Sequence, residues 1–416
     1  MKIVHFNTFE GGGGAAKASL ALHRAMLLQK TDSKLVVHRR TSSDESVIGR
    51  SPSRLGLRNK RLIPWLLSAV HRVLWRPLET WTFGVFGDRT IPHHRVVEEA
   101  DIIALSWVGW FLDVDSIQTL LAYDKPVVWT CYDMWAFTGG CHYSGDCDQY
   151  AAKCEQCPQM GNALAQKIPQ QIWANKKDHW DTSRLTVVCP SDWLAEKVRQ
   201  SGLLGGRRVE VIPTGIDTTV YRPSSRQVAR NSLGLPQDKP LVLFIATRGF
   251  ANERKGGPLL QESLHFLHSI QQDKLPDIVV LGRRQSTSDL HSKFKIHSLE
   301  FDDDESLALL YSACDVLVAP SKADTLPLTV LQAMACGTPC VAYDAGGMAD
   351  AIEHTRNGYL ANAFDTEQFA RGINFILTDS ARHESLAAQS VARIKSGFTA
   401  EIEAKRYLEL YTELLR

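Results

Sequence analysis

Short apolar runs alternate with polar or amphipathic stretches along most of this chain. The first series of runs is KIVHFN at 2–7, KLVVHR at 34–39, DIIALSW at 101–107, PVVWTC at 126–131 and LTVVCP at 185–190. A second series, from Pro240, is PLVLFIA, DIVVLG, DVLVAP and PCVAYD. Such runs, each followed by helical or polar sequence, are typical of strands in parallel sheets covered by helices. The pattern predicts an α/β protein with two Rossmann-like domains that face each other across a cleft.

The boundary between the two series is predicted at VIPTGIDTTVYRP, residues 211–223, which holds two prolines and a glycine after a strand. We expect an N-terminal domain over 1–213 and a C-terminal domain over 214–398. A last helix, within 399–416, is expected to return to the N-terminal domain.

Composition narrows the class of protein. A chain of 416 residues is long enough for two domains, and 44% apolar with 22% charged residues is globular composition. The net charge of +1 gives no overall field toward nucleic acid, so we expect no nucleic-acid partner. The N-terminus does not resemble a signal peptide, and no run of about 20 apolar residues occurs. Nine cysteines are few for a secreted disulfide scaffold, and a cytoplasmic location is expected.

The most informative stretch is LVAPSKADTLPLTVLQAMACGTPCVAYDAGG, residues 317–347. It predicts a buried strand, a loop with Asp324, a helix that opens near Leu328, a second strand and a paired glycine. Asp324 and Gln332 lie eight residues apart, in the loop and on the helix. We expect both at the carboxyl edge of a parallel sheet, where open α/β sheets bind ligands.

This stretch resembles the donor-binding signature of retaining glycosyltransferases of family 4, which have the GT-B fold. The family pattern is E-x7-E, then A-M-A-x-G-x-P-V-V and a Gly-Gly turn. Asp324 and Gln332 take the two acidic places, and the matching residues are Ala333, Met334, Ala335, Gly337, Pro339, Gly346 and Gly347. The linker at 211–223 resembles the family's V-I-P-N-G-V-D element, with Thr214 in place of Asn.

The resemblance implies roles for these residues. Asp324 would bind hydroxyls of the transferred sugar, and backbone amides near Thr325, Leu326 and Leu328 would add contacts. Gln332 would meet the ribose, where the family has an acid. A carboxamide there gives a neutral hydrogen bond, which we expect to weaken that contact by about 1 kcal/mol. The alternative for Gln332 is a residue on the helix surface.

A second element, ATRGFANERKGG at 246–257, follows the first strand of the second series and resembles the family's G-R-x-x-x-x-K-G. Lys255 fits the diphosphate-binding lysine. Its arginine partner is either Arg254 or Arg248. The competing interpretation is a solvated start of a helix.

The loop GGGGAAKASL at 11–20 follows the first strand. Glycines and a helix N-terminus suit phosphate, so Gly13 and Gly14 are candidates to face the donor phosphates when the domains close. The dinucleotide-binding pattern G-x-G-x-x-G is not met, because Ala16 occupies the third glycine position.

Asp302, Asp303 and Asp304 resemble a metal-binding D-x-D. We interpret them instead as the acidic first turn of the helix DESLALLYSA, and expect no catalytic metal.

An insert from Trp129 to Met160 resembles a W-T-x-H-D-M-W-A-F-T-G-G-C-H-Y-S insert in a family 4 branch linked to exopolysaccharide and colanic-acid-like assembly. Tyr132 replaces a histidine that approaches the donor sugar in the family. Four cysteines of the predicted insert 131–160, Cys141, Cys147, Cys154 and Cys157, have the spacing C-x5-C-x6-C-x2-C. This spacing suits a structural zinc site; the alternatives are reduced buried thiols or two disulfides.

The segment RLGLRNKRLIPWLLSAVHRVLW at 54–75 interleaves five basic residues with apolar ones and holds no acid. It predicts either an amphipathic helix at an anionic membrane surface or an ordinary helix packed on the sheet.

We therefore expect a retaining, metal-independent glycosyltransferase. It would move a hexose from a nucleoside diphosphate sugar to a surface-polysaccharide acceptor, lipid-linked or not, at the inner face of the membrane or in the cytoplasm. Because Tyr132, Gln332 and Thr214 all depart from the family pattern, the alternative is a relative that binds sugar nucleotide or a partner without catalysis. A nucleotide-sugar epimerase is a weaker third hypothesis.

Overall fold

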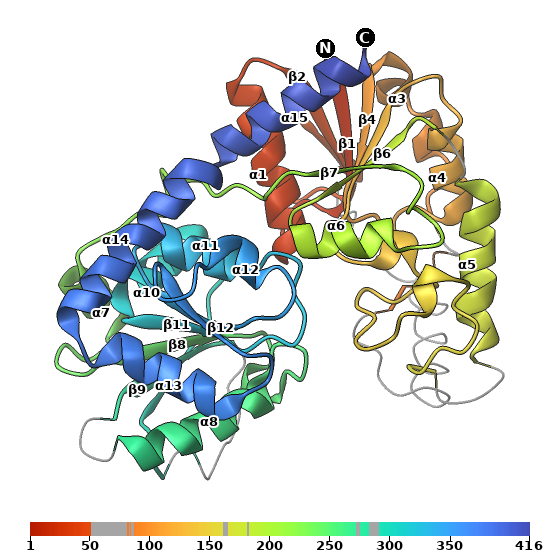
Figure 1. Cartoon of the computed structure of the whole chain (residues 1–416). Helices are drawn as coiled ribbons and strands as arrows, with labels where there is room; N and C mark the ends of the chain where they lie inside the picture. The colour runs from red at the N-terminus through yellow and green to blue at the C-terminus, as the bar shows by residue number, and fades with distance from the viewer. Residues whose placement is uncertain are drawn as a thin grey trace, which may run out of the picture. The chain divides into compact units, whose positions relative to one another are not determined.

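A computed structural model describes residues 1–50, 81–82, 84, 87–160, 165–180, 183–271, 275–282, 290 and 292–416 of the chain. The chain forms two compact units, each built on its own parallel sheet (Figure 1). Unit 1 comprises Met1–Ile212 and Ala404–Arg416, and unit 2 comprises Pro213–Glu403. The boundary predicted after residue 213 thus lies one residue beyond the first break, and the one predicted after residue 398 precedes the second.

Unit 1 holds a seven-stranded sheet in the order β3-β2-β1-β4-β5-β6-β7. The strands are β1 (Lys2–Phe9), β2 (Asp32–Arg39), β3 (Val47–Arg50), β4 (Ile102–Leu105), β5 (Val127–Thr130), β6 (Leu185–Cys189) and β7 (Arg208–Val211). The helices are α1 (Gly14–Leu28), α3 (Arg95–Glu99), α4 (Val114–Leu121), α5 (Lys167–His179), α6 (Asp192–Arg199) and α15 (Ala400–Leu414), with 3-10 turns η1 (Ile91–His93), η2 (Trp135–Phe137) and η3 (Gln149–Ala151). Strands β4, β5 and β6 are buried throughout, as expected of parallel strands covered on both faces.

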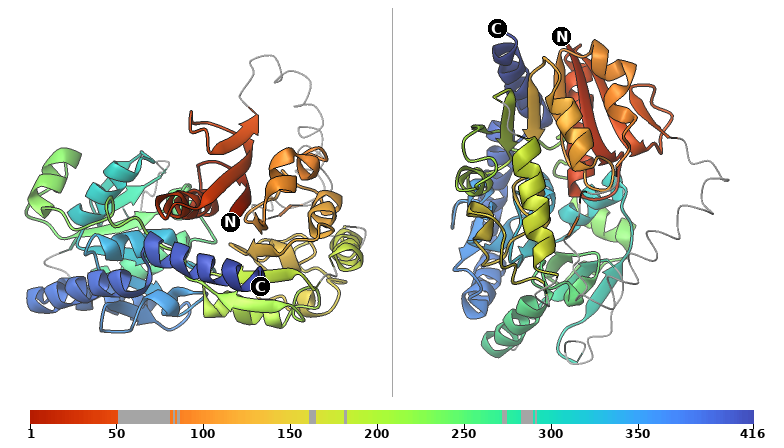
Figure 2. Two further views of the ribbon diagram at one scale, coloured as in Figure 1. Left: turned by 90° about the horizontal axis from the view of Figure 1, so that it is seen from above. Right: turned by 90° about the vertical axis from the view of Figure 1, so that its right-hand side faces the viewer.

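The two faces of this sheet carry different helices. Alternate residues of the strands, such as Val4 and Phe6, join a core with residues of α4 and α6. On the opposite face, Thr130 of β5 hydrogen-bonds with the hydroxyl of Tyr407 in α15 at 2.8 Å. The C-terminal segment of the chain thereby covers one face of the N-terminal sheet (Figure 2).

Unit 2 holds a six-stranded sheet in the order β10-β9-β8-β11-β12-β13. The strands are β8 (Leu241–Ile245), β9 (Asp277–Leu281), β10 (Ile296–Leu299), β11 (Val316–Ala319), β12 (Cys340–Tyr343) and β13 (Gly358–Ala361). The helices are α7 (Arg226–Leu233), α8 (Gly257–Ile270), α10 (Asp304–Ala313), α11 (Leu328–Ala335), α12 (Met348–Ala351), α13 (Thr366–Leu377) and α14 (Ser380–Gly397), with the 3-10 turn η4 (Gly249–Ala251).

An apolar core packs against each face of this second sheet. Leu241 and Leu243 of β8 pack with residues of α7, α10 and α11, whereas Val242 and Phe244 pack with residues of α8 and α13. Successive side chains of a strand point to opposite faces, so one strand serves both cores. Figures 1 and 2 show α8 and α13 together on one side of this sheet.

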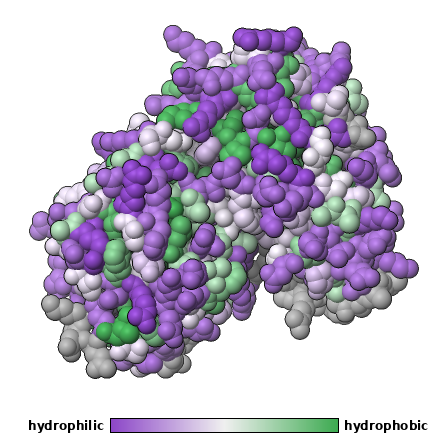
Figure 3. Space-filling model, viewed as in Figure 1, coloured by the Kyte–Doolittle hydropathy of each residue, from purple (hydrophilic) through white to green (hydrophobic). Residues whose placement is uncertain are grey.

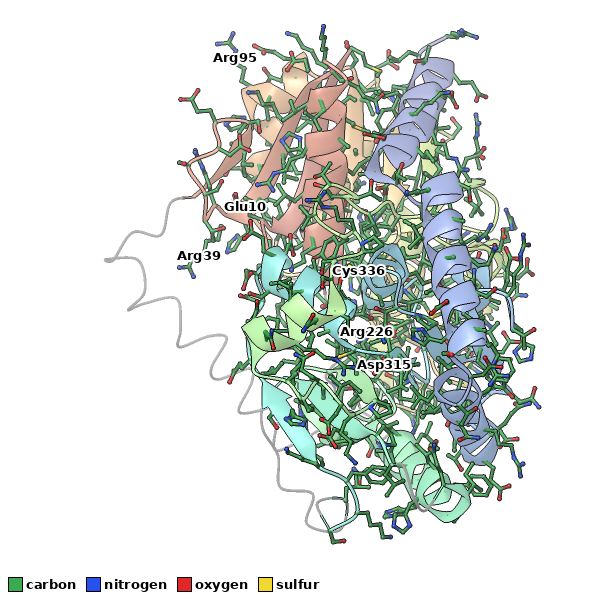
Figure 4. All side chains as sticks on the ribbon, turned by 90° about the vertical axis from the view of Figure 1, so that its left-hand side faces the viewer. Glu10, Arg39, Arg95, Arg226, Asp315 and Cys336 are labelled. Atoms are coloured by element: carbon green, nitrogen blue, oxygen red, sulfur yellow. The ribbon has the colours of Figure 1, made fainter. Side chains whose placement is uncertain are left out.

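The amino edge of the second sheet is held by a buried ion pair. Asp315, directly before β11, accepts from Arg230 at 2.8 Å and from the backbone N–H of Leu241 at 2.7 Å. Arg226 adds a contact of 2.9 Å to the second carboxylate oxygen, and Figure 4 shows it beside Asp315. The pair fixes β8 and β11 at their starts, at the edge opposite to their carboxyl ends.

Helix α14 is buried along one side and more exposed along the other. α14 buries Leu386, Ser390 and Ile394, and its remaining residues are more exposed. Figure 3 accordingly shows mostly hydrophilic residues over this helix. Within the described residues, no helix combines the length and apolar character needed to cross a bilayer.

Candidate functional site

The order of strands defines where a ligand is expected in each unit. In unit 2 the chain builds outward from β8 in one direction through β9 and β10, and from β11 in the other through β12 and β13. β8 and β11 are therefore the neighbouring strands at which the order reverses. Open α/β sheets bind ligands at the carboxyl ends of such a pair. The loops that leave these two ends are residues 246–256 and 320–327.

These two loops bring three predicted site residues together. Asp324 accepts from Lys255 Nζ at 2.9 Å through one carboxylate oxygen and from Arg254 Nη1 at 2.8 Å through the other. Arg254 also donates to the carbonyl of Ala323 at 3.0 Å. The side chains of Lys255 and Arg254 are 22% and 30% exposed, against 9% for Asp324. The acid is thus enclosed, and both cations keep part of their surface in solvent.

Three glycines allow the loops to approach this closely. Gly256 has a φ of +72°, and a Cβ there would lie 1.7 Å from the carbonyl oxygen of Pro320. Gly346 has a φ of +65°, and a Cβ there would lie 2.2 Å from the carbonyl oxygen of Asp324. The N–H of Gly347 donates to that same oxygen at 2.9 Å. The glycine pair after β12 therefore holds the loop that carries the acid.

The charges of the cluster favour an ionised acid. Burial opposes the negative charge of Asp324, but the nearby Lys255 and Arg254, with a hydrogen bond from Ser321, outweigh it, and the pKa of Asp324 lies below its ordinary value. Two cations and one carboxylate leave one positive charge on the cluster. A partly exposed site with net positive charge suits an anionic ligand.

The helix after the acid starts without a cap from a side chain. Pro327 precedes α11, its side chain gives no capping hydrogen bond, and the first turn holds no acidic residue. Thr325 and Leu326 are buried in the loop, and Leu328 opens the helix. The N-terminus of a helix carries a partial positive charge, and no side chain caps it here. This charge has the same sign as the charges of Lys255 and Arg254.

Gln332 lies on α11 as predicted, but its side chain does not join this cluster. The residue is 6% exposed, and its Oε1 accepts from the buried hydroxyl of Tyr311 at 3.0 Å. The alternative of a helix-surface residue is therefore wrong. Its predicted contact with a ribose stays a prediction.

Arg248 is exposed on the same loop as Lys255, directly before η4. Arg254, one of the two arginines proposed for the diphosphate, contacts Asp324. Asp303 caps α10 by accepting from the N–H of Ser306 at 2.8 Å, and the helix begins at Asp304. The interpretation of the three aspartates as a helix start is confirmed.

In unit 1 the strand order reverses between β1 and β4. The loop after β1 holds Gly13, which has a φ of +87° and open space where a Cβ would lie, and α1 begins at Gly14. Glu10, beside Arg39 in Figure 4, anchors this loop by accepting from the backbone N–H groups of Thr41 and Ser42. Burial opposes the charge of Glu10, but these hydrogen bonds outweigh it and lower its pKa.

A polar network at the same edge was not anticipated from the sequence. Asp133 accepts from Trp107 Nε1 at 2.7 Å and from His142 Nδ1 at 2.5 Å, and His142 Nε2 contacts Thr82 Oγ1 at 2.7 Å. Asp133 and His142 lie in the insert at 129–160, whereas Thr82 and Trp107 come from two other segments, so no single spacing in the sequence joins all four. Tyr132, predicted to approach the donor, is half-buried next to Asp133.

Cys141, Cys147, Cys154 and Cys157 line one pocket, and all nine cysteines of the chain are free thiols. The other five cysteines are buried. Among the described residues, no group of three or more His, Cys, Asp or Glu side chains is arranged to hold a metal ion. The basic segment at 54–75 lies outside the described residues.

Comparison with known proteins agrees with this geometry. Residues 225–392 match the family of "Glycosyl transferases group 1". This stretch lies within unit 2 and contains Arg254, Lys255 and Asp324, so the match falls on the part of the chain that holds the candidate site.

Curated relatives match part of the chain. One is a "D-inositol 3-phosphate glycosyltransferase" of Nocardia farcinica, which is 28% identical over 236 residues, 53% of this chain and 51% of the relative. The chain spans about half the length of the curated relatives it matches.

Solved structures match over the whole chain. Sucrose-phosphate synthase from Thermosynechococcus elongatus has a TM-score of 0.69 at 19% identity and covers 100% of this chain and 99% of its own. Anabaena Alr3699/HepE, solved in complex with UDP and glucose, has a TM-score of 0.64 at 16% identity, with 99% of both chains covered. The predicted GT-B fold, with two Rossmann-like domains, is confirmed.

Proposed function

We propose that this protein is a glycosyltransferase that moves a hexose from a nucleoside diphosphate sugar to a saccharide acceptor. One observation carries the proposal: Lys255, Arg254 and Asp324 meet at the carboxyl ends of β8 and β11. This edge is where an α/β sheet binds nucleotides, and the cluster combines cations for a diphosphate with an acid for sugar hydroxyls.

The proposed role of the cluster is to stabilise negative charge during the transfer. In the transfer, the bond between the anomeric carbon and the diphosphate oxygen breaks, and its electron pair leaves with the diphosphate. A bond from the acceptor oxygen to the anomeric carbon forms, and the acceptor hydroxyl proton passes to the departing diphosphate. Lys255 and Arg254 would offset the negative charge that develops on the leaving group, the type of stabilisation that lowers such barriers most. In this role the two cations replace a catalytic metal.

Retention of anomeric configuration is part of the proposal. It rests on the resemblance at 317–347 and on the position of Asp324, which is engaged by two cations and so is suited to hold hydroxyls rather than to attack the anomeric carbon. Gln332 is proposed to reach the ribose from α11. Unchanged donor affinity in Gln332→Glu would reject that assignment.

The proposed acceptor is a growing surface-polysaccharide intermediate, free or lipid-linked, met in the cytoplasm or at an anionic membrane surface. The resemblance of the insert at 129–160 supports a polysaccharide acceptor. The free state of the cysteines is in keeping with a reducing compartment. Since curated relatives bear the name D-inositol 3-phosphate glycosyltransferase, an inositol phosphate belongs among the acceptors to be tested.

The experiment measures binding and turnover separately. Thermal shift against a panel of sugar nucleotides identifies the donor, and release of nucleoside diphosphate measures donor hydrolysis and transfer. We expect Lys255→Met to weaken donor binding by at least about tenfold, as expected from losing a charge-assisted contact. The matched control is Lys395→Met, because Lys395 is an exposed lysine on α14.

Two results would contradict the proposal. Binding of a donor without release of diphosphate with any acceptor would favour the non-catalytic alternative. No binding of any sugar nucleotide by the folded protein would reject both.

A further inference from the structure

The insert between β5 and α5 holds a pocket that the proposed transfer reaction does not use. Its walls include Cys141, Cys147, Cys154 and Cys157, with Trp81, Tyr150 and Gln159 among the other lining residues. The cavity has a volume of about 10 Å³. This is roughly the space of one water molecule, so the pocket has room for a single ion and not for an organic ligand.

Backbone N–H groups are directed at the thiols of the C-x2-C pair. The N–H of Gly139 donates to Cys154 Sγ at 3.3 Å. The backbone amides of Gln159 and Met160 hydrogen-bond with Cys157. Burial raises the pKa of both thiols, and these N–H groups oppose that rise while they fix the direction of each sulfur.

The backbone at Cys154 is held in an unusual conformation. Its φ is +51°, in the left-handed region that residues with a side chain seldom occupy. Such a conformation costs about 1–3 kcal/mol and tends to occur where function requires a side chain in a fixed place. Here it directs Cys154 into the pocket that Cys157 also lines.

A buried lysine lies beside the cysteines. Lys176 of α5 is fully buried, and its Nζ donates to the carbonyls of Trp135 and Thr138 in the insert. Burial lowers the pKa of Lys176 to about 7, and the nearby Cys141 and Cys154 act in the opposite direction. Four thiolates around Zn²⁺ carry two net negative charges, which would favour the protonated form of a lysine placed next to them.

We propose that Cys141, Cys147, Cys154 and Cys157 bind one zinc ion with tetrahedral geometry. The four thiols line one cavity, and in the described residues they are not yet arranged around one point. Binding forms four Zn–S bonds of about 2.3 Å, and the four thiol protons leave to solvent.

The zinc ion would stabilise the insert, because the apolar core of the insert is small. The described residues from Gly139 to Met160 contain the short turn η3 and no longer helix or strand. Their apolar contacts form a small cluster with Trp81 and Ile172, in which Cys141 and Cys157 themselves take part. Small loop-rich modules of this kind commonly depend on a metal or disulfides. The zinc would fix the insert that carries Asp133 and His142 at the carboxyl edge of the first sheet.

The test uses the full chain, purified under reducing conditions and dialysed against buffer without metal. Elemental analysis should find about one zinc per chain. Cys154→Ser and Cys157→Ser should each lower the zinc content at least about tenfold. Cys314→Ala is the matched control, because Cys314 is a buried thiol of unit 2 far along the chain from the insert, and it should keep the zinc.

A second measurement uses wild-type protein, so its result does not depend on whether the cysteine variants fold. Wild-type protein stripped of metal and titrated with Co²⁺ should develop the sulfur-to-cobalt charge-transfer absorption and the visible bands of a tetrahedral thiolate site, saturating at one ion per chain. Zinc below about a tenth of an ion per chain together with a featureless cobalt titration would overturn the proposal. Intact-mass evidence for two disulfides in freshly purified protein would overturn it as well.

Discussion

Asp324 is the residue on which the candidate site depends most. It is enclosed, it engages both cations, and it stands at the point where the order of strands reverses. Its position was predictable from sequence, because an acid that closely follows a buried strand is placed at the carboxyl edge by the strand itself. The network of Asp133, His142 and Trp107 was not predictable, because its members come from loops whose proximity depends on the folded sheet.

Replacing Asp324 by Asn should reduce kcat/KM about 10²- to 10³-fold, since two cations would lose their charged partner and the sugar its acceptor. Steady-state kinetics with the donor found by thermal shift measures this. Glu253→Gln is the control, because the Glu253 side chain is 76% exposed and lies 3.6 Å from Lys322. Equal losses in both variants would contradict a specific role for Asp324.

The same variant should change the response to acid. Because the folded pKa of Asp324 is depressed, its contribution to the free energy of unfolding is present above the ordinary Asp pKa of about 4 and is lost as pH falls through the lower folded value. Urea unfolding of wild type and Asp324→Asn between pH 7 and pH 3 should therefore show a difference that shrinks toward acid. A difference that does not depend on pH would mean that the charge of Asp324 contributes nothing to stability.

At the scale of elements, the apolar runs predicted strands well where both faces of the strand are buried. The helix start at Leu328 and the helix of DESLALLYSA were also found as predicted. The edge strands β10 and β13 were missed, because IHSL is only partly buried and GYLA opens with a glycine. An edge strand has a neighbouring strand on one side only and is covered less completely than a central strand. Its sequence therefore lacks the continuous apolar run that predicts a central strand.

Two loops approach each other closely at Gly256, and a substitution there tests how much this contact depends on glycine. Gly256→Ala should destabilise the protein and displace Lys255, because the new Cβ would overlap the carbonyl of Pro320 at a φ of +72°. Gly234→Ala is a matched control: Gly234 has a φ of +65° but open space around its Cα. The control should cost about 1–2 kcal/mol for the left-handed backbone alone. Urea unfolding should show a larger loss for Gly256→Ala, and an equal loss in both would contradict the steric account.

At the scale of the whole molecule, the chain leaves unit 1 after Ile212 and returns to it at Ala404. The two passages are joined within unit 2: the N–H of Ile216 donates to Phe398 at 2.8 Å, and the N–H of Ala400 donates to Ile216 at 3.1 Å. Glu403 secures the junction by accepting from the N–H of Gly215 at 2.8 Å. The linker and the final helix were both predicted, but their mutual hydrogen bonds depend on residues nearly 200 positions apart and have no local sequence signal.

Burial raises the pKa of Glu403 to about 8, although the N–H of Gly215 works against this rise. The folded protein therefore binds a proton that the unfolded chain releases above an ordinary Glu pKa of about 4.3. Stability should fall as pH rises through this window, at no more than about 1.4 kcal/mol per pH unit. Glu403→Gln should flatten the dependence in urea unfolding between pH 5 and pH 8, whereas Glu401→Gln, exposed on the same helix, should keep it. Identical slopes in wild type and Glu403→Gln would exclude Glu403 as the source.

The return of α15 also sets an order of events during synthesis. Every residue of unit 2 has been translated by Glu403, whereas Tyr407 and Tyr411, both fully buried in unit 1, follow it. Although its strands emerge from the ribosome first, unit 1 is thus the later of the two to mature. A fragment of the chain that ends at Glu403 should carry a protease-resistant unit 2 beside an unfinished unit 1.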